Sequence, residues 1–131
     1  MSFQEIQSSI EPVFLSPSWA SMGVTTVPAN VNAPTGSEFV RLNIFIPASQ
    51  IDEFGGAIDV GFVELNVFTL SGQGEKRQYE ICDALDVLLN GKTLGSVQFG
   101  KSILTKIGLD PQDSQLWRCD YIVPFTSPTT L

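Results

Sequence analysis

Residues 61–89 constrain the fold more than any other segment, because an alternating strand runs through a short polar turn into an amphipathic helix. Residues 61–70 alternate apolar and polar side chains, which is the period-two pattern of a strand with one buried face. Residues 75–89 then repeat apolar side chains at helical spacing, so one stripe of this helix should pack on the sheet. That stripe is Ile81, Leu85 and Leu88. The unit contains no catalytic residue.

Further strands surround this unit. One alternating strand precedes it over 39–46, a polar loop over 48–59 follows that strand, and three strand-like runs come after the helix. Those runs are 94–99, 102–107 and 116–125. Strands, one main helix and strands again predict an α+β fold, in which the helix covers one face of a mostly antiparallel sheet.

The N-terminal third has a different composition. A short helix is expected over 2–10, and Pro12 should end it. Residues 11–36 are rich in Pro, Ser, Thr and Asn, which predicts an irregular arm with one edge strand around 19–27. With 131 residues, the chain is long enough for one core and too short for two ordinary ones, so we expect a single domain over 1–131.

The charge argues against a nucleic-acid-binding surface. Seven basic and fourteen acidic residues give a net charge of −7, and binding to phosphates needs clustered Lys and Arg. No secretory signal or run of about 20 apolar residues is evident, so we expect a soluble protein made in a cytoplasm.

One motif matches a nucleotide-binding pattern by its letters. Gly95, Gly100, Lys101 and Ser102 fit the P-loop pattern G-x-x-x-x-G-K-[ST]. A P-loop needs a helix after it, because the helix N-terminus and backbone N–H groups hold the phosphates. Residues 103–107 are instead strand-like, so we favour a hairpin with its turn at Gly100 and Lys101, and we predict no cofactor.

Other chemistry is poorly supported. The chain has no histidine, which excludes Ser-His-Asp and Cys-His sites and leaves metal binding to carboxylates alone. Asp52, Glu53, Asp59 and Glu64 are interpreted as solvated loop carboxylates rather than an acid–base pair. We therefore predict no enzyme and no metal site.

The two cysteines, Cys82 and Cys119, have neither redox-motif nor zinc-site spacing. We expect both to be small buried hydrophobes. A disulfide is conceivable only if they approach one another, and a reducing compartment disfavours it.

The second face of the sheet is also apolar in places. Phe45, Phe62 and Phe68 should lie on it, opposite the helix, and an exposed apolar sheet face is typical of a subunit interface.

From residue 27 onward, the order of parts resembles the tail terminator proteins of long-tailed bacteriophages, also called tail completion or minor tail proteins. The matching parts are the proline-bounded loop 28–34, strands 39–46 and 61–68, the Gly72-x-Gly74 turn before the helix, and the closing strand 121–125. The resemblance implies a structural virion protein that assembles in the bacterial cytoplasm. It would form a hexameric ring on the tail tube, end tube growth and present the surface that joins the head. The implied partners are a second copy, the tail tube protein and a head–tail connector protein, with DNA passing through without specific binding and no membrane involved.

Several residues are candidate contacts on this basis. Gln50, Asp52, Glu53 and Phe54 would face a neighbouring copy or the tube, and Asn30 and Asn32 the opposite side, with Phe62 and Phe68 on the sheet face. Three alternatives stay open: another head–tail connector or neck protein, a nucleotide-binding protein that uses Lys101, and a carboxylate enzyme.

Overall fold

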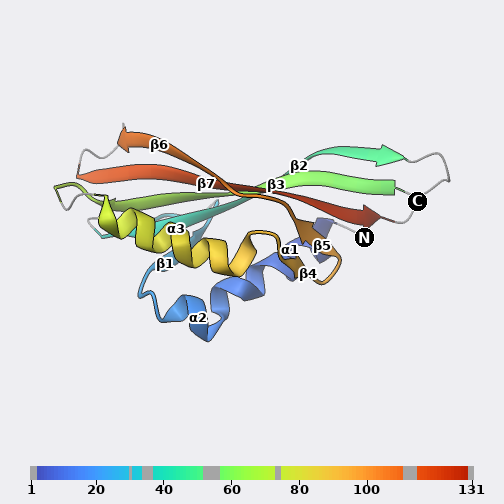
Figure 1. The fold of residues 1–131 in the computed structure, drawn as a ribbon, viewed down its shortest axis with the longest axis horizontal. Helices are drawn as coiled ribbons and strands as arrows, with labels where there is room; N and C mark the ends of the chain where they lie inside the picture. The colour runs from blue at the N-terminus through green and yellow to red at the C-terminus, as the bar shows by residue number, and fades with distance from the viewer. Residues whose placement is uncertain are drawn as a thin grey trace.

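A long, twisted sheet with helices on one of its faces makes up the computed structural model, which describes residues 3–29, 31–33, 37–51, 57–72, 75–110 and 115–129 (Figure 1). The helical segments are α1 (Phe3–Ile10), the 3-10 helix η1 (Glu11–Leu15), α2 (Pro17–Ala20) and α3 (Lys76–Leu89). The strands are β1 (Thr25–Pro28), β2 (Phe39–Ile51), β3 (Ala57–Leu70), β4 (Thr93–Leu94), β5 (Val97–Phe99), β6 (Ile103–Leu109) and β7 (Leu116–Thr129). The predicted α+β class, with one main helix and a short N-terminal helix, is confirmed.

The order of the strands within the described residues is β1-β2-β3-β7-β5-β4, and β6 pairs with β7 beyond the end of β5. Only β1 and β2 pair in parallel; the other described pairs are antiparallel. The central pair is β3 and β7, whose register runs without a break from Ala57 opposite Thr129 to Leu70 opposite Leu116.

The core lies between the helices and one face of the sheet. The inward side chains of α3 include Ile81, Leu85 and Leu89, all fully buried, which confirms the predicted apolar stripe over most of its length. Ile6 and Ile10 of α1 join the same cluster. The sheet contributes alternate residues of its three long strands: Val40, Leu42, Val63, Leu65, Val67, Cys119, Tyr121, Val123 and Phe125.

The predicted irregular arm is partly helical. Residues 11–15 form η1 and residues 17–20 form α2, while the predicted edge strand around 19–27 is reduced to β1. Pro17 occupies the first turn of α2, where its missing N–H costs nothing, and Trp19 donates its backbone N–H to the Ser16 hydroxyl at 3.4 Å. Pro17 is one of the prolines that predicted an extended loop, but in the structure it begins a helix.

Trp19 fixes this arm on the core. Its indole N–H donates to the Thr26 hydroxyl at 2.7 Å, and its ring meets Phe14 edge to face. A buried tryptophan that also satisfies its polar atom holds the arm against the sheet.

The long strands extend past their predicted ends. β2 continues to Ile51 and β3 begins at Ala57, so most of the predicted 48–59 loop is a projecting hairpin. The pairing of β2 with β3 skips residues 46 and 47, where Pro47 has no N–H for the ladder. Similarly, β7 runs to Thr129 instead of ending at 125.

The predicted hairpin turn at Gly100 and Lys101 is wrong. The hairpin joins β4 and β5, and its turn is Gly95 and Ser96, where Gly95 has a positive φ of 60°. Residues 100–102 instead link β5 to β6, because both of these strands pair with β7. In the described part of the chain, no helix is long and apolar enough to cross a membrane.

Candidate functional site

The face of the sheet that points away from α1, α2 and α3 has no layer of described residues over it (Figure 1). Strand register places alternate residues of β2, β3 and β7 on this open face. They form a polar middle between two groups of aromatic side chains. The open face is the main candidate for contact with another protein.

Asn66 is the centre of the polar middle. Its side-chain NH₂ donates to Asp120 Oδ1 at 2.9 Å and to Glu64 Oε1 at 3.1 Å, and its carbonyl accepts from Asn43 at 2.9 Å. Arg118 then donates to both oxygens of Asp120, at 2.9 and 3.2 Å. Three strands are thereby joined by side-chain hydrogen bonds in addition to the backbone ladder.

The electrostatics of this cluster follow from its partial burial. Burial, followed by the nearby Asp120 charge, raises the pKa of Glu64 above its ordinary value of 4.5. The hydrogen bonds to Asp120 raise the pKa of Arg118. These charged and amide side chains contact one another across the sheet. The cluster therefore holds β2, β3 and β7 together on the open face.

Two of the four predicted solvated carboxylates are not in a loop. Asp59 is buried and Glu64 is half-buried, and both belong to β3, whose alternation places them on opposite faces of the sheet. They cannot pair as acid and base. Asp52 and Glu53 lie outside the described residues. Within the described ranges, no group of three or more His, Cys, Asp or Glu is placed to hold a metal ion.

The aromatic groups at the two ends of the open face differ in exposure. Phe39 and Phe68 stack with ring centroids 4.4 Å apart and close over Val27 and Leu116, leaving Phe68 only 7% exposed. At the other end Phe45 stacks on Phe62 at 4.9 Å and is 41% exposed. Phe62 with Phe45 therefore offers apolar surface to a neighbour, whereas Phe68 is already covered.

The remaining predicted contacts are placed only in part. Asn32 is exposed beside a turn held by Arg41, whose guanidinium donates to the carbonyl oxygens of Pro28, Ala29 and Val31. Gln50 lies in β2 opposite Ile58, and its side chain is outside the described part. Asn30 and Phe54 are also outside it.

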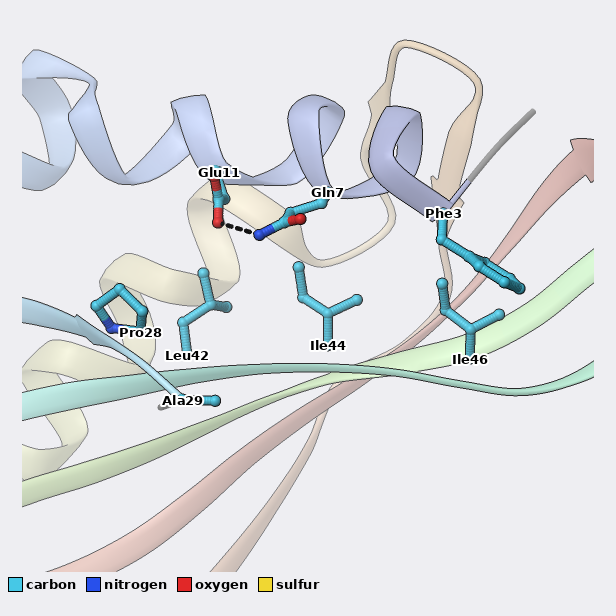
Figure 2. Close-up of a pocket in the computed structure, with 8 residues that line it drawn as sticks. All are labelled: Phe3, Gln7, Glu11, Pro28, Ala29, Leu42, Ile44 and Ile46. Atoms are coloured by element: carbon cyan, nitrogen blue, oxygen red, sulfur yellow. Dashed lines mark hydrogen bonds between the residues drawn. The ribbon is translucent and has the colours of Figure 1, made fainter. Parts of the chain in front are cut away.

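Sequence reasoning missed a groove at the edge of β2. β1 pairs with β2 only as far as Leu42, and no other described strand pairs with that edge. A hollow of about 290 Å³ begins at this point, between α1 and the sheet (Figure 2). Ile44 and Ile46 form its floor, and Phe3 and Gln7 line the α1 side (Figure 2).

Gln7 donates to Glu11 Oε1 at 2.8 Å across the wall of this hollow (Figure 2). A second hollow, of about 470 Å³, continues along the arm and shares Glu11, Pro28 and Leu42 with the first. The two together give a continuous, largely apolar groove beside an unpaired strand edge.

Part of the opposite edge of the sheet is β6, and β4 forms the other part. The inner side of β6 pairs with β7, and no described strand pairs with its outer side. Four of its large apolar side chains are exposed, with Ile103 at 59%. They are Ile103, Leu104, Ile107 and Leu109.

The P-loop-like segment has a different local structure from a P-loop. β6 rather than a helix follows Ser102. The Ser102 hydroxyl donates to Asp86 Oδ1 at 2.6 Å, and its backbone N–H donates to Asn90 Oδ1 at 2.8 Å. Ser102 is thus tied to the C-terminal end of α3, and the adjacent Lys101 is exposed.

No family model and no curated protein sequence matches the chain. Several solved structures share its fold, and two of them follow. One is a chain of the virion of a native gene transfer agent particle, 16% identical, with a TM-score of 0.67 and 94% of each chain covered. The other, whose name states no function, is 13% identical with a TM-score of 0.64, and covers 100% of this chain and 98% of that one.

Proposed function

We propose that the chain is a structural protein of a phage-like virion, and that it caps the tail tube as a ring, of six copies as the family resemblance implies. In this role it ends tube polymerisation and forms the tail-side surface to which the head is joined. The fold that it shares with a gene transfer agent virion chain supports the virion role. The resemblance to tail terminators supports the finer assignment.

The observation that carries the ring is the pair of unpaired sheet edges. An exposed edge strand with several large apolar side chains is an association surface, because its backbone groups and apolar side chains both lack partners. β6 is such a strand over seven residues. The free edge of β2 over 43–51 has a comparable length and lies beside the apolar groove.

The strand directions make these edges compatible. β2 and β7 run the same way because each is antiparallel to β3, and β6 runs against them. The registers place β6 level with β2 residues 39–43, most of which β1 covers, so β6 of one copy would meet the free edge of β2 in the next copy in a ring whose strands tilt away from the axis, and the two strands would be antiparallel. Such a contact joins two different edges, and it generates a ring where the rotation between neighbouring copies closes.

Charge also favours this contact. Glu11 lines the groove, whereas Lys92 directly precedes β4 and Lys101 precedes β6, and all three are exposed. Opposite charges on the two joining edges help to select one orientation. The net charge of −7 also suits a ring through which DNA passes without binding.

The test is the absolute mass of the purified chain by light scattering over a concentration series, followed by electron microscopy of any large species. We expect rings of about six copies, and we expect them to bind the ends of purified tail tubes. Rings that bind the head-side connector but not tube ends would favour a neck protein instead. A monomer that also fails to bind tube ends would refute the proposal.

A further inference from the structure

Two buried thiols meet between the main helix and the central strands. Cys82 lies on the inward side of α3 and is 6% exposed, and Cys119 lies on the inward face of β7 and is 1% exposed. Their sulfur atoms are 3.8 Å apart, although 37 residues separate them in the sequence. Both are free thiols in this structure.

This spacing brings the thiols within reach of a covalent bond. A disulfide requires the sulfurs to come to about 2.05 Å, so they must approach by less than 2 Å. The thiols already face one another across one helix–sheet contact, so a small shift of α3 or a rotation of one side chain supplies that approach. We propose that Cys82 and Cys119 are an oxidation site, at which a thiol oxidant forms an intramolecular disulfide that joins α3 to β7.

The contact also affects how readily each sulfur ionises. The hydrogen bond from Cys82 lowers the pKa of Cys119, whereas the same contact and burial raise the pKa of Cys82. The thiolate is the reactive form of cysteine. The lower pKa favours Cys119 as the first nucleophile, with Cys82 then resolving the intermediate.

Diamide, a diazene that takes up two electrons, is a suitable oxidant. The Cys119 thiolate attacks one nitrogen of the N=N bond, and the π electrons of that bond pass to the other nitrogen, which takes up a proton from water. Cys82 sulfur then attacks Cys119 sulfur, so the S–N bond breaks as the S–S bond forms. The Cys82 proton and the S–N electron pair pass to nitrogen, giving the hydrazine. Two thiols have then lost two protons and two electrons.

The burial of both sulfurs sets the rate of this reaction. The oxidant reaches them only when α3 moves away from the sheet, so oxidation should be slower than for an exposed thiol. Once formed, the bond closes a long loop and restricts the unfolded chain. It should raise the unfolding temperature by up to about 10 °C.

The experiment treats the reduced full chain with diamide at low protein concentration, then removes the oxidant and alkylates the chain in denaturant. The expected product has lost two hydrogens from its intact mass and takes up no alkyl group. Trypsin cuts the chain into 78–92 and 119–131, which hold the two cysteines separately, so a linked pair of these peptides identifies the bond. Dithiothreitol should restore two alkylatable thiols and the lower unfolding temperature.

Cys82→Ala and Cys119→Ala are the matched controls. Each should keep one alkylatable thiol and show no loss of two hydrogens within one chain. The comparison of oxidised and reduced wild type needs neither variant, so it stands if one of them fails to fold. Two alkylated thiols after oxidation, or a bond only between different chains, would overturn the inference. Neither result depends on whether the chain forms a ring.

Discussion

Replacing Ile103 by lysine tests the proposed ring contact through β6. Full burial of an isoleucine side chain contributes about 1.5–3 kcal/mol. Ile103 is 59% exposed in the isolated chain, so covering the remainder would contribute about 1–2 kcal/mol at each contact. A closed ring has one such contact per copy, so six copies would lose about 6–12 kcal/mol in total.

The same substitution should leave the isolated chain nearly unchanged, because an exposed position typically alters stability by less than about 0.5 kcal/mol. We expect Ile103→Lys to remain monomeric in sedimentation at concentrations where wild type forms rings, with an unchanged unfolding curve. Val87→Lys is the matched control, since Val87 is 71% exposed on α3. Normal rings with Ile103→Lys, or equal loss of rings with Val87→Lys, would refute the reasoning.

Three further substitutions test the fold and the open face. Trp19→Phe removes the indole N–H that donates to Thr26, and should cost about 1–2 kcal/mol in urea unfolding; an unchanged midpoint would contradict this role. Gly61→Ala places a methyl group against a backbone carbonyl and an aromatic ring of neighbouring strands, and should cost about 1–3 kcal/mol by the same measurement. Burial and the Asp120 charge raise the pKa of Glu64, so the folded chain is penalised while Glu64 is ionised. Glu64→Gln should stabilise the chain at pH 7 by about 0.5 kcal/mol, with a gain that shrinks as pH falls toward 4.5; a gain independent of pH would argue against this cause.

The spacing of apolar residues correctly predicted the helix and the strands that pack around the core. The helix expected over 75–89 is Lys76–Leu89, because its apolar stripe packs in the core from Ile81 to Leu89. The strand ends were predicted less well, since alternation fades where β2 and β3 project as a hairpin and backbone pairing continues without a core. Prolines misled the interpretation of the arm, where Pro17 begins a helix anchored by Trp19.

The candidate surface was largely beyond sequence reasoning. Asn66 and Asp120 are 54 residues apart and meet only because of the register of β3 and β7. The edge of β2 is free because β1 pairs with it only as far as Leu42, and the outer edge of β6 is free because no described strand pairs with it. No single residue in the sequence predicts where such pairing stops. The apolar composition of 103–109 was visible, but its exposure follows from its place at the outside of the sheet.

The position of β7 has a consequence for the order of folding. β7 lies beside β3 in the middle of the sheet, yet it follows every other described strand in the sequence, and its pairs with β3 join residues 46 to 72 positions apart. During synthesis the β2–β3 hairpin, α3 and the β4–β5 hairpin can form early, but β6 has no strand to pair with, and the β4–β5 hairpin cannot join the sheet, until β7 emerges. Pairing over such long separations is slow. A nascent chain therefore has neither a finished sheet nor a paired β6 until β7 has left the ribosome. Association of one copy with another through β6 must then wait until β7 has been synthesised.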